Sequence, residues 1–398
     1  MNMLYNIIFS LKGALNIMAL FILFNSAFSQ FIPNVKSSSF FVKNETLLDS
    51  TKIDSILTFA NNNQITKLFV DSFTEGYAIY NSSIIPNHPE LDSLFDPLSY
   101  ILRKNLNENI EIHASIDTYL LWTNSIPPEN KNHLYYVCED CFESDFNGKS
   151  DRKIDLYDNQ SKNWEGIFLS PLHPNVNQYI LSIVEDLLNN YNLDGINLKN
   201  IRYQDSYYGY NKDGISSFIN EFDFDPRDLN RGLISSRFGF EQSHIDSLYG
   251  LWNDFRIGKV TQLVRSVKYK TIGDSLNITL SASVKPNYIL SKDRWYQDWE
   301  SWINENLLDF VIIENYDLYN EFIFNNKFLI ENKFSYVNQG KIHLAIKPSI
   351  VNMDNLTEQI FHSRLLGFKS FLIFPSSEIN DSLNIYEPLY NVINFNLY

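Results

Sequence analysis

Short apolar runs recur along the whole chain. Several of them are separated by stretches in which apolar residues are three or four positions apart. These runs are rich in β-branched and aromatic residues and are bounded by polar and turn-forming residues, which is typical of strands. Eight segments fit this description: Ser38–Val42, Ile65–Phe73, Ile110–Leu120, Leu193–Ile201, Asn277–Pro286, Leu308–Asp317, Lys341–Ser349 and Lys369–Ser377.

Three intervening segments place apolar residues three or four positions apart, which is the spacing of a helix with one buried face. They are Ser50–Asn63, Asn175–Tyr191 and Asn355–Leu366. Near-continuous apolar strands that alternate with helices indicate a parallel sheet covered on both faces, and therefore an α/β fold. Eight such units would close into a single (β/α)8 TIM barrel, with a doubly wound open sheet as the alternative.

Two insertions follow the third and fourth predicted strands. Residues Trp122–Pro174 and Gln204–Ile245 are rich in Asn, Asp, Tyr and Pro, as long loops are. Loops that follow barrel strands form the face on which active sites lie. We see no repeat and no second domain, so residues 30–398 are predicted to form one barrel.

The first 29 residues have the pattern of a signal peptide. Lys12 supplies the positive charge, Ala14–Phe24 the apolar core, and the small residues before Gln30 a cleavage site after Ser29. The apolar run is too short to span a bilayer, which takes about 20 residues. We expect export to the periplasm or the cell exterior, and the alternative is an uncleaved anchor.

Composition and net charge limit the classes of molecule that the protein can bind. The chain has 398 residues, 44% of them hydrophobic, and a formal net charge of -15, which excludes a nucleic-acid partner because phosphate binding needs a basic face. We expect no metal or cofactor, since the seven histidines lack a ligand spacing such as HxxxH and no glycine-rich phosphate loop occurs. Cys138 and Cys141, the two cysteines, are predicted to form a local disulfide in an exported chain.

Polar residues gather where the predicted strands end, which in a barrel is the active-site mouth. Aromatic residues crowd the loops there, and they could stack on sugar rings or simply pack the loops. The polar residues are Asp71, Ser72, His113, Asp117, Asn197, Lys199, Arg202, Tyr203, Lys285, Glu314, Asn315, Tyr316, Lys347, Ser376 and Ser377, and the aromatic residues are Trp122, Trp164, Tyr207, Tyr208, Tyr210 and Trp295.

The order of several motifs resembles the glycosyl hydrolase-like 10 family, exported bacterial (β/α)8 proteins taken to act on glycosidic bonds. The resemblance implies the barrel in preference to the open sheet, and a glycan or polysaccharide as the partner. It rests on the segments Phe95–Leu102, Ile110–Asn124, Leu169–Gln204, Arg294–Asp317 and Gly340–Ser349.

The chain departs from the family at chemically important positions. The fourth strand of the family usually reads Asp-Gly-Ile-His-Leu-Asp and is followed by Arg-Tyr-Pro, so that here Asn197 replaces a histidine, Lys199 an aspartate and Gln204 a proline. On the sixth strand the family usually has Pro-Met-Asn-Tyr, and this chain has Glu314 in place of the methionine. An acid is therefore gained on one strand and lost on another.

Glycoside hydrolysis normally needs two carboxyl groups, and a lysine cannot replace the one that attacks or activates water. One hypothesis is that Lys199 and Glu314 form an exchanged ion pair across the mouth. The rival hypothesis is that Glu314 is a replacement catalytic acid that works with Asp117 or Asp71. Two functions therefore stay open, an exported glycosidase and a catalytically inactive glycan-binding relative.

For the glycosidase, Asp117 and Glu314 are the candidate catalytic acids, and Asp194 is predicted to be structural at the strand entry. The residues predicted to contact sugar are Trp122, Asn197, Lys199, Arg202, Tyr203, Lys285, Asn315, Tyr316 and Lys347.

Overall fold

The computed structural model describes residues 34–106, 109–153, 164–273, 278–316, 319–331, 336–348, 353–375 and 383–395. The predicted signal peptide, Ser376 and Ser377 lie outside the described residues.

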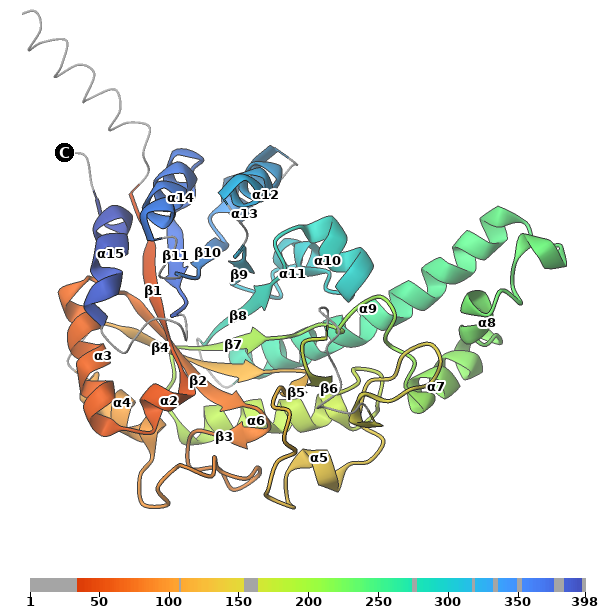
Figure 1. The fold of residues 1–398 in the computed structure, drawn as a ribbon, viewed down its shortest axis with the longest axis horizontal. Coiled ribbons are helices and arrows are strands. Elements are labelled where there is room, and N and C mark those ends of the chain that lie inside the picture. The colour runs from red at the N-terminus through yellow and green to blue at the C-terminus, as the bar shows by residue number, and fades with distance from the viewer. Residues whose placement is uncertain are drawn as a thin grey trace, which may run out of the picture.

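Eight parallel strands form a closed barrel (Figure 1). Parallel pairing of β1 with both β2 and β11 closes the sheet on itself, so the predicted TIM barrel is confirmed and the open sheet is excluded. All eight predicted strands are present, with ends shifted by a few residues. In barrel order they are β1 (Ser37–Val42), β2 (Lys67–Thr74), β4 (Glu111–Asp117), β7 (Gly195–Lys199), β8 (Thr279–Val284), β9 (Phe310–Glu314), β10 (Ile342–Ile346) and β11 (Ser370–Ile373).

Helices surround this barrel, and the three that the apolar spacing predicted are α3, α6 and α14. Several begin at a residue whose side chain caps the first turn, as Asp96 does by accepting a hydrogen bond from the amide of Ser99 at 3.1 Å. The helices are α2 (Asn44–Leu47), α3 (Ser50–Asn62), α4 (Pro97–Lys104), α6 (Val176–Asn190), α9 (Gln242–Ile272), α10 (Tyr288–Trp295), α11 (Trp299–Asn304), α12 (Tyr319–Glu331), α13 (Tyr336–Gln339), α14 (Met353–Leu365), the 3-10 turn η4 (Leu383–Tyr386) and α15 (Glu387–Ile393).

The two predicted insertions follow β4 and β7. The first contains the antiparallel pair β5 (Leu120–Trp122) and β6 (Ile167–Phe168), with α5 (Leu134–Val137) and η1 (Asp151–Lys153) between them. The short strand β3 (Tyr77–Ala78) pairs with β2. The second insertion contains α7 (Lys212–Phe222), α8 (Arg227–Asn230) and η2 (Ser236–Phe238), and together with the first half of α9 it extends away from the barrel as an arm (Figure 1).

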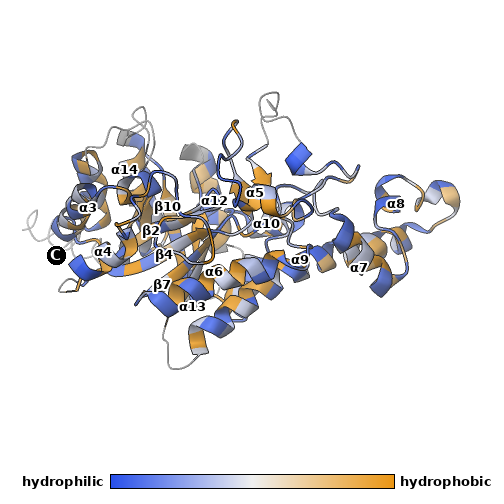
Figure 2. Cartoon of the chain, turned by 90° about the horizontal axis from the view of Figure 1, so that it is seen from below, coloured by the Kyte–Doolittle hydropathy of each residue, from blue (hydrophilic) through white to orange (hydrophobic). Residues whose placement is uncertain are grey.

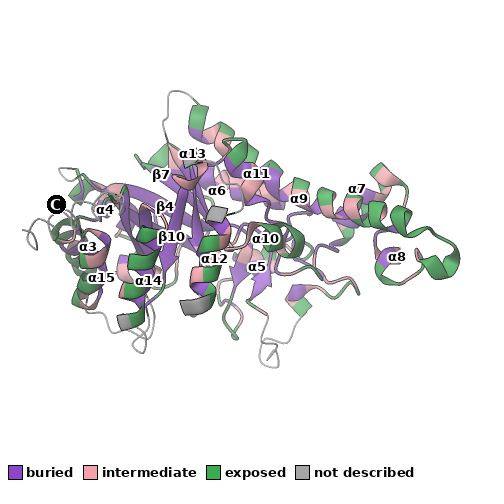
Figure 3. Cartoon of the chain, turned by 90° about the horizontal axis from the view of Figure 1, so that it is seen from above, coloured by how far each residue is buried: buried purple, intermediate pink, exposed green. Residues whose placement is uncertain are grey.

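Side chains alternate along the strands, as the sequence pattern predicts. Ile196 and Leu198 on β7 are fully buried in the main apolar core between the sheet and the helices. Figure 3 shows the strands as buried and the outer faces of the surrounding helices as exposed. Hydrophobic and hydrophilic residues both occur along α6 and α9 (Figure 2). Within the described part of the chain, no helix is long and apolar enough to cross a membrane.

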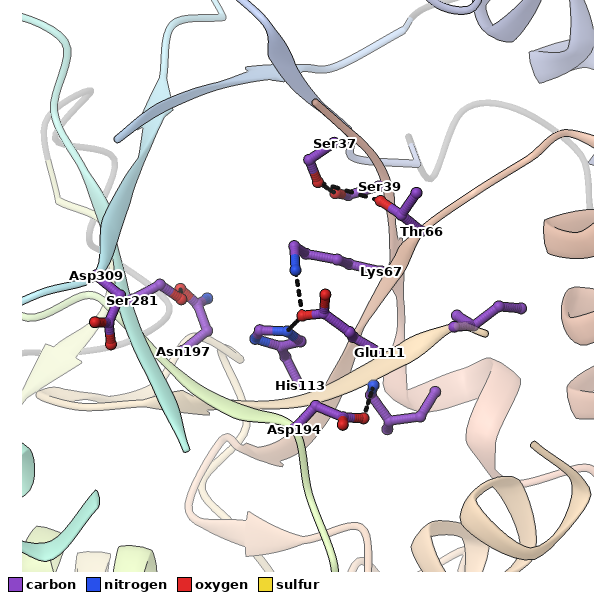
Figure 4. A network of polar contacts seen from close by, with 12 residues as sticks. Ser37, Ser39, Thr66, Lys67, Glu111, His113, Asp194, Asn197, Ser281 and Asp309 are labelled. Carbon is purple, nitrogen blue, oxygen red and sulfur yellow. Dashed lines mark hydrogen bonds and ion pairs between the residues drawn. The ribbon is translucent and has the colours of Figure 1, made fainter. Parts of the chain in front are cut away.

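The interior of the barrel is unusually polar for a TIM barrel, in which branched apolar residues normally dominate. Asn197 donates to the hydroxyls of Ser115 and Ser283, both at 3.3 Å, and accepts from Ser281 at 3.1 Å. Nearer the amino-terminal ends of the strands, Glu111 binds Lys67 and His113 (Figure 4). Because each of these side chains has a polar partner inside the barrel, the interior fixes the relative positions of the strands.

Gly195 opens β7 because the neighbouring strand leaves no room for a side chain there. A Cβ atom at this position would overlap the imidazole of His113, which is fully buried and lies 3.0 Å from Glu111 Oε2 through its Nε2 atom. The glycine of the Asp-Gly sequence therefore serves the close approach of β4 and β7.

We predict that Gly195→Ala lowers the free energy of unfolding by about 1–3 kcal/mol, the usual effect of overpacking a filled interior. Urea denaturation of the mature chain measures this change. The matched control is Gly258→Ala on α9, where an added Cβ meets nothing within 4 Å and alanine favours the helix. Equal stability of the Gly195 variant and the wild type would contradict this account of the glycine.

Candidate active site

A buried lysine joins two strand ends at the mouth of the barrel. Lys199 ends β7, and its Nζ atom lies 2.6 Å from Asp71 Oδ1 on β2 and 3.5 Å from Asp117 Oδ1 on β4. The ammonium group also lies 5.1 Å from the ring centroid of Phe41 on β1, a cation–π distance. One cation therefore holds the ends of these neighbouring strands together.

The carboxylate of Asp117 accepts hydrogen bonds from two further residues besides its contact with Lys199. Thr74 Oγ1 donates to its Oδ2 atom at 2.7 Å, and Asn200 Nδ2 donates to its Oδ1 atom at 2.8 Å. Asn200 follows β7 with a φ of 50°, in the left-handed region that asparagine tolerates better than most residues. With three polar partners, this carboxylate is fixed in the protein.

In the lysine cluster (Asp71, Asp117 and Lys199), the pKa values of Lys199 and Asp71 are shifted. Burial by itself would lower the pKa of Lys199, but the carboxylates of Asp117 and Asp71 outweigh it and the pKa is raised. Burial raises the pKa of Asp71 to about 7, and Lys199 opposes this rise while Asp117 adds to it. The lysine therefore stays protonated at neutral pH, and Asp71 is the group that titrates.

A second set of charged side chains, Glu165, Arg202 and Lys285, lies beside the lysine cluster. Arg202 binds Glu165 through Nη2, and Lys285 Nζ lies 3.7 Å from the other oxygen of Glu165. Burial raises the pKa of Glu165, but the two cations outweigh this and lower it. The buried guanidinium also packs over the ring of Phe168, 5.4 Å from its centroid, so its orientation is set by β6.

Glu314, at the end of β9, makes no hydrogen bond or ion pair with any residue that the structure describes. Its side chain is partly buried, and burial raises its pKa, against the opposing effect of Lys285, Arg202 and Lys199. The hypothesis of a Lys199–Glu314 ion pair is wrong in its partner, because the lysine pairs with the nearer carboxylates of Asp71 and Asp117. Glu314 is left as the unengaged acid of the mouth.

Aromatic rings border the lysine cluster on one side. Tyr316 is 40% exposed, and its ring lies 5.7 Å from Lys347 Nζ and 6.2 Å from the ring of Phe374. Phe374 in turn stacks on Phe41 at 4.2 Å, the ring beneath the Lys199 ammonium. These rings offer an apolar surface next to charged groups.

Several predicted sugar contacts are not brought to this mouth. Tyr203 is fully buried and its hydroxyl donates to the carbonyl of Arg256. Asn315 donates to the carbonyl of Phe322 on α12. Trp122 is buried with its indole N–H on the carbonyl of Ile126.

Two further predicted site residues lie deeper in the barrel or at its far end. Asn197 lies inside the barrel within the serine network. Asp194 accepts a hydrogen bond from the amide of Ile112 at 2.8 Å, at the entry of β4. This is the structural contact expected of a residue at the strand entry.

Among the aromatic residues of the loops, some are buried packing residues and others are exposed. Tyr210 is buried against Trp252, with a 5.5 Å ring separation, whereas Tyr207 is 63% exposed. Trp295 lies beside Lys285, whose Nζ atom is 5.5 Å from the ring centroid of the tryptophan. At least Tyr210 is therefore a packing residue.

Sequence reasoning missed Glu165, Phe41, Thr74 and Asn200. Glu165 lies in an insertion whose path no periodicity reveals, and Phe41 reads as one apolar residue among many on its strand. Asn200 follows the lysine directly, and an asparagine after a strand is a signal for a left-handed residue. That signal alone could have found one of the four.

Replacing Lys199 with methionine should destabilise the fold strongly, because two buried acids lose their counterion. We predict a loss of about 3–5 kcal/mol at pH 8, the usual effect of breaking a buried pair. The pKa of Asp71 is already higher in the folded chain than its ordinary value, and removal of the lysine raises it further. Stability is then lost as the pH rises through neutrality, so the loss should be smaller at pH 5.

Urea denaturation at the two pH values measures this difference. Lys104→Met is the matched control, since Lys104 pairs with Asp54 on the exposed surface and such pairs contribute little. An equal loss for Lys199→Met at both pH values would show that the titrating carboxylate is not involved.

Solved structures of glycosidases share this fold. The glycoside hydrolase domain of PgaB (BpsB) from Bordetella bronchiseptica superposes with a TM-score of 0.65 at 11% identity, covering 91% of this chain and 99% of that one. The catalytic domain of the β-amylase from Paenibacillus polymyxa has a TM-score of 0.52 at 10% identity, covering 89% and 97%. The β-galactosidase from the psychrophilic Marinomonas ef1 has a TM-score of 0.55 at 9% identity, covering 89% and 59%.

At such identities the likeness establishes the fold alone. No curated protein matches the chain. The model of the glycosyl hydrolase-like 10 family, however, matches residues 30–327, which is well over half of the sequence. With its TIM barrel, the chain is therefore a glycoside hydrolase-like protein that belongs to the glycosyl hydrolase-like 10 family.

Proposed function

We propose that the barrel mouth binds a glycan and does not hydrolyse it by the two-carboxylate mechanism. The observation that carries this proposal is the position of Lys199, whose ammonium lies between the carboxylates of Asp71 and Asp117.

Hydrolysis of a glycosidic bond uses one carboxyl group as an acid and another as a nucleophile or base. Asp71 and Asp117 both contact the same ammonium, and Asp117 also accepts hydrogen bonds from Thr74 and Asn200. A cation held at this point would also oppose the positive charge that develops on the sugar ring. Of the carboxylates at this mouth, Glu314 is the one that has no bonding partner among the described residues.

Glycan binding does not require a pair of free carboxylates, and the mouth has groups of the kind that bind sugars. Aromatic faces such as those of Tyr316 and Phe374 cover the apolar faces of sugars, while charged and amide groups bond the hydroxyls. Lys347 lies beside the Tyr316 ring. Glu314 is close enough to Lys285 and Arg202 to feel their charges, so acceptors and donors border the rings. Membership of a glycosyl hydrolase-like family and the glycosidase folds of the similar structures support the same ligand class.

A second candidate function is hydrolysis with Glu314 as the acid and Asp71 as the second carboxylate. The raised pKa of Glu314 favours it, because a general acid must hold its proton near neutral pH. It requires that the bound substrate draw Asp71 away from Lys199.

We also propose that the chain is exported after cleavage behind Ser29, to the periplasm or beyond. The signal-like pattern of residues 1–29 supports this. The disulfide between Cys138 and Cys141 supports it as well, since such bonds persist in oxidising compartments.

We predict that the purified mature chain binds at least one member of a panel of cell-wall and matrix glycans without releasing reducing ends. Glu314→Gln should weaken binding about tenfold or more, since a charged acceptor of the sugar hydroxyls is lost. Calorimetry measures affinity, and a reducing-sugar assay measures cleavage. The control is Glu321→Gln, which changes an exposed acid on α12.

The outcomes separate the two functions. Cleavage by the wild type that Glu314→Gln abolishes would overturn the binding proposal in favour of the hydrolase. Absence of binding to any glycan would contradict both. Activity gained by Lys199→Asp alone would support a site in which the lysine is what blocks hydrolysis.

A further inference from the structure

Three insertion segments meet at the Cys138–Cys141 disulfide, away from the lysine cluster. Cys141 is buried, and its carbonyl accepts a hydrogen bond from the amide of Ser170 at 2.7 Å. Asn211, at the start of α7, donates to the carbonyl of Asp140 at 2.7 Å. The segments after α5, after β6 and before α7 are thereby fixed to one another.

Metal-ligating side chains surround this disulfide. His173 Nδ1 lies 3.7 Å from Cys141 Sγ, and Asp140 Oδ1 lies 3.6 Å from Cys138 Sγ. One potential ligand atom from each of these four residues falls within 4.8 Å of all the others. The sequence concealed this arrangement, because the histidine lies 32 residues beyond the cysteine that it faces.

We propose that this cysteine cluster (Cys138, Asp140, Cys141 and His173) is a redox-controlled zinc site. In the oxidised chain the two sulfurs are bonded to each other. When a dithiol reductant opens that bond, both thiolates become ligands of a zinc ion that His173 and Asp140 complete.

The donor set and its spacing suit zinc. Zinc prefers four tetrahedral ligands, and bonds of about 2.3 Å to sulfur and 2.0 Å to nitrogen place neighbouring sulfur and nitrogen ligands about 3.5 Å apart. The observed separation of Cys141 Sγ and His173 Nδ1 is close to that value. Soft thiolates together with an imidazole select zinc over magnesium or calcium, which bind oxygen ligands.

His173 is already oriented for this role. Its Nδ1 atom accepts a hydrogen bond from the amide of Asn175 at 3.3 Å, so Nδ1 carries a lone pair and Nε2 the proton. Nε2 lies 3.7 Å from Asp213 Oδ2 and 3.6 Å from Asp140 Oδ1. Asp213 is an outer carboxylate of the kind that fixes metal-binding histidines, and Asp140 must turn from Nε2 to reach a metal at Nδ1. Asp140 is exposed, which leaves a path for the ion from solvent.

The reduction step balances. The disulfide takes up two electrons and two protons as the dithiol becomes a cyclic disulfide, and zinc binding then releases the two thiol protons to solvent. The cluster would thus hold the same three segments together in either state, by a covalent bond or by a metal. This inference does not depend on the proposed glycan site.

The test uses the mature chain, reduced with a dithiol, desalted without oxygen and titrated with Co²⁺ and then Zn²⁺. We predict one metal per chain, with the thiolate-to-cobalt charge-transfer absorption of a tetrahedral site, lost when Zn²⁺ is added. The oxidised chain should show no such absorption. Cys138→Ser should abolish the thiolate spectrum of the wild type, and His173→Gln should weaken binding at least tenfold.

His244→Gln, a change at an exposed histidine on α9, should bind as the wild type does. Circular dichroism verifies that each variant is folded, and the comparison of oxidised and reduced wild type needs no variant at all. A reduced chain without thiolate-to-cobalt absorption would overturn the proposal. So would unchanged affinity in folded His173→Gln.

Discussion

The mouth of the barrel depends on one buried cation. Lys199 lies at the end of β7, where it contacts the carboxylates of Asp71 and Asp117 and the face of Phe41. Two carboxylates buried side by side would repel each other and would each be poorly solvated, and the ammonium relieves both effects. The ends of four strands are arranged around this charge, and the same charge engages two acids.

Because Lys199 engages two of the acids, other polar groups form the rest of the barrel mouth. With Asp71 and Asp117 engaged, Glu314 is the acid of the mouth without a bonding partner among the described residues, and the charges of Lys285 and Arg202 act on it. The polar serine and asparagine network deeper in the barrel supports this layer from below. A site of this kind has binding groups of both signs and an aromatic edge, but not a free pair of carboxylates.

The sequence predicted the fold well because each strand and helix is encoded locally. All eight strands and the three helices α3, α6 and α14 follow from apolar spacing. The partners of Lys199 could not be predicted in the same way. Which carboxylate a lysine reaches depends on the barrel register, where Asp117 lies opposite Lys199, and no local pattern contains that information. The same limit hid Glu165 and the approach of His173 to the cysteines, since both lie on long insertions.

The central claim is that Lys199 keeps the two strand-end acids neutralised while a glycan is bound. A crystal structure of the mature chain soaked with an oligosaccharide ligand tests it most directly. We expect an intact glycosidic bond beside Glu314, with Lys199 Nζ still in contact with Asp71 and Asp117. A cleaved sugar, or Asp71 turned from the lysine toward the anomeric carbon, would contradict it.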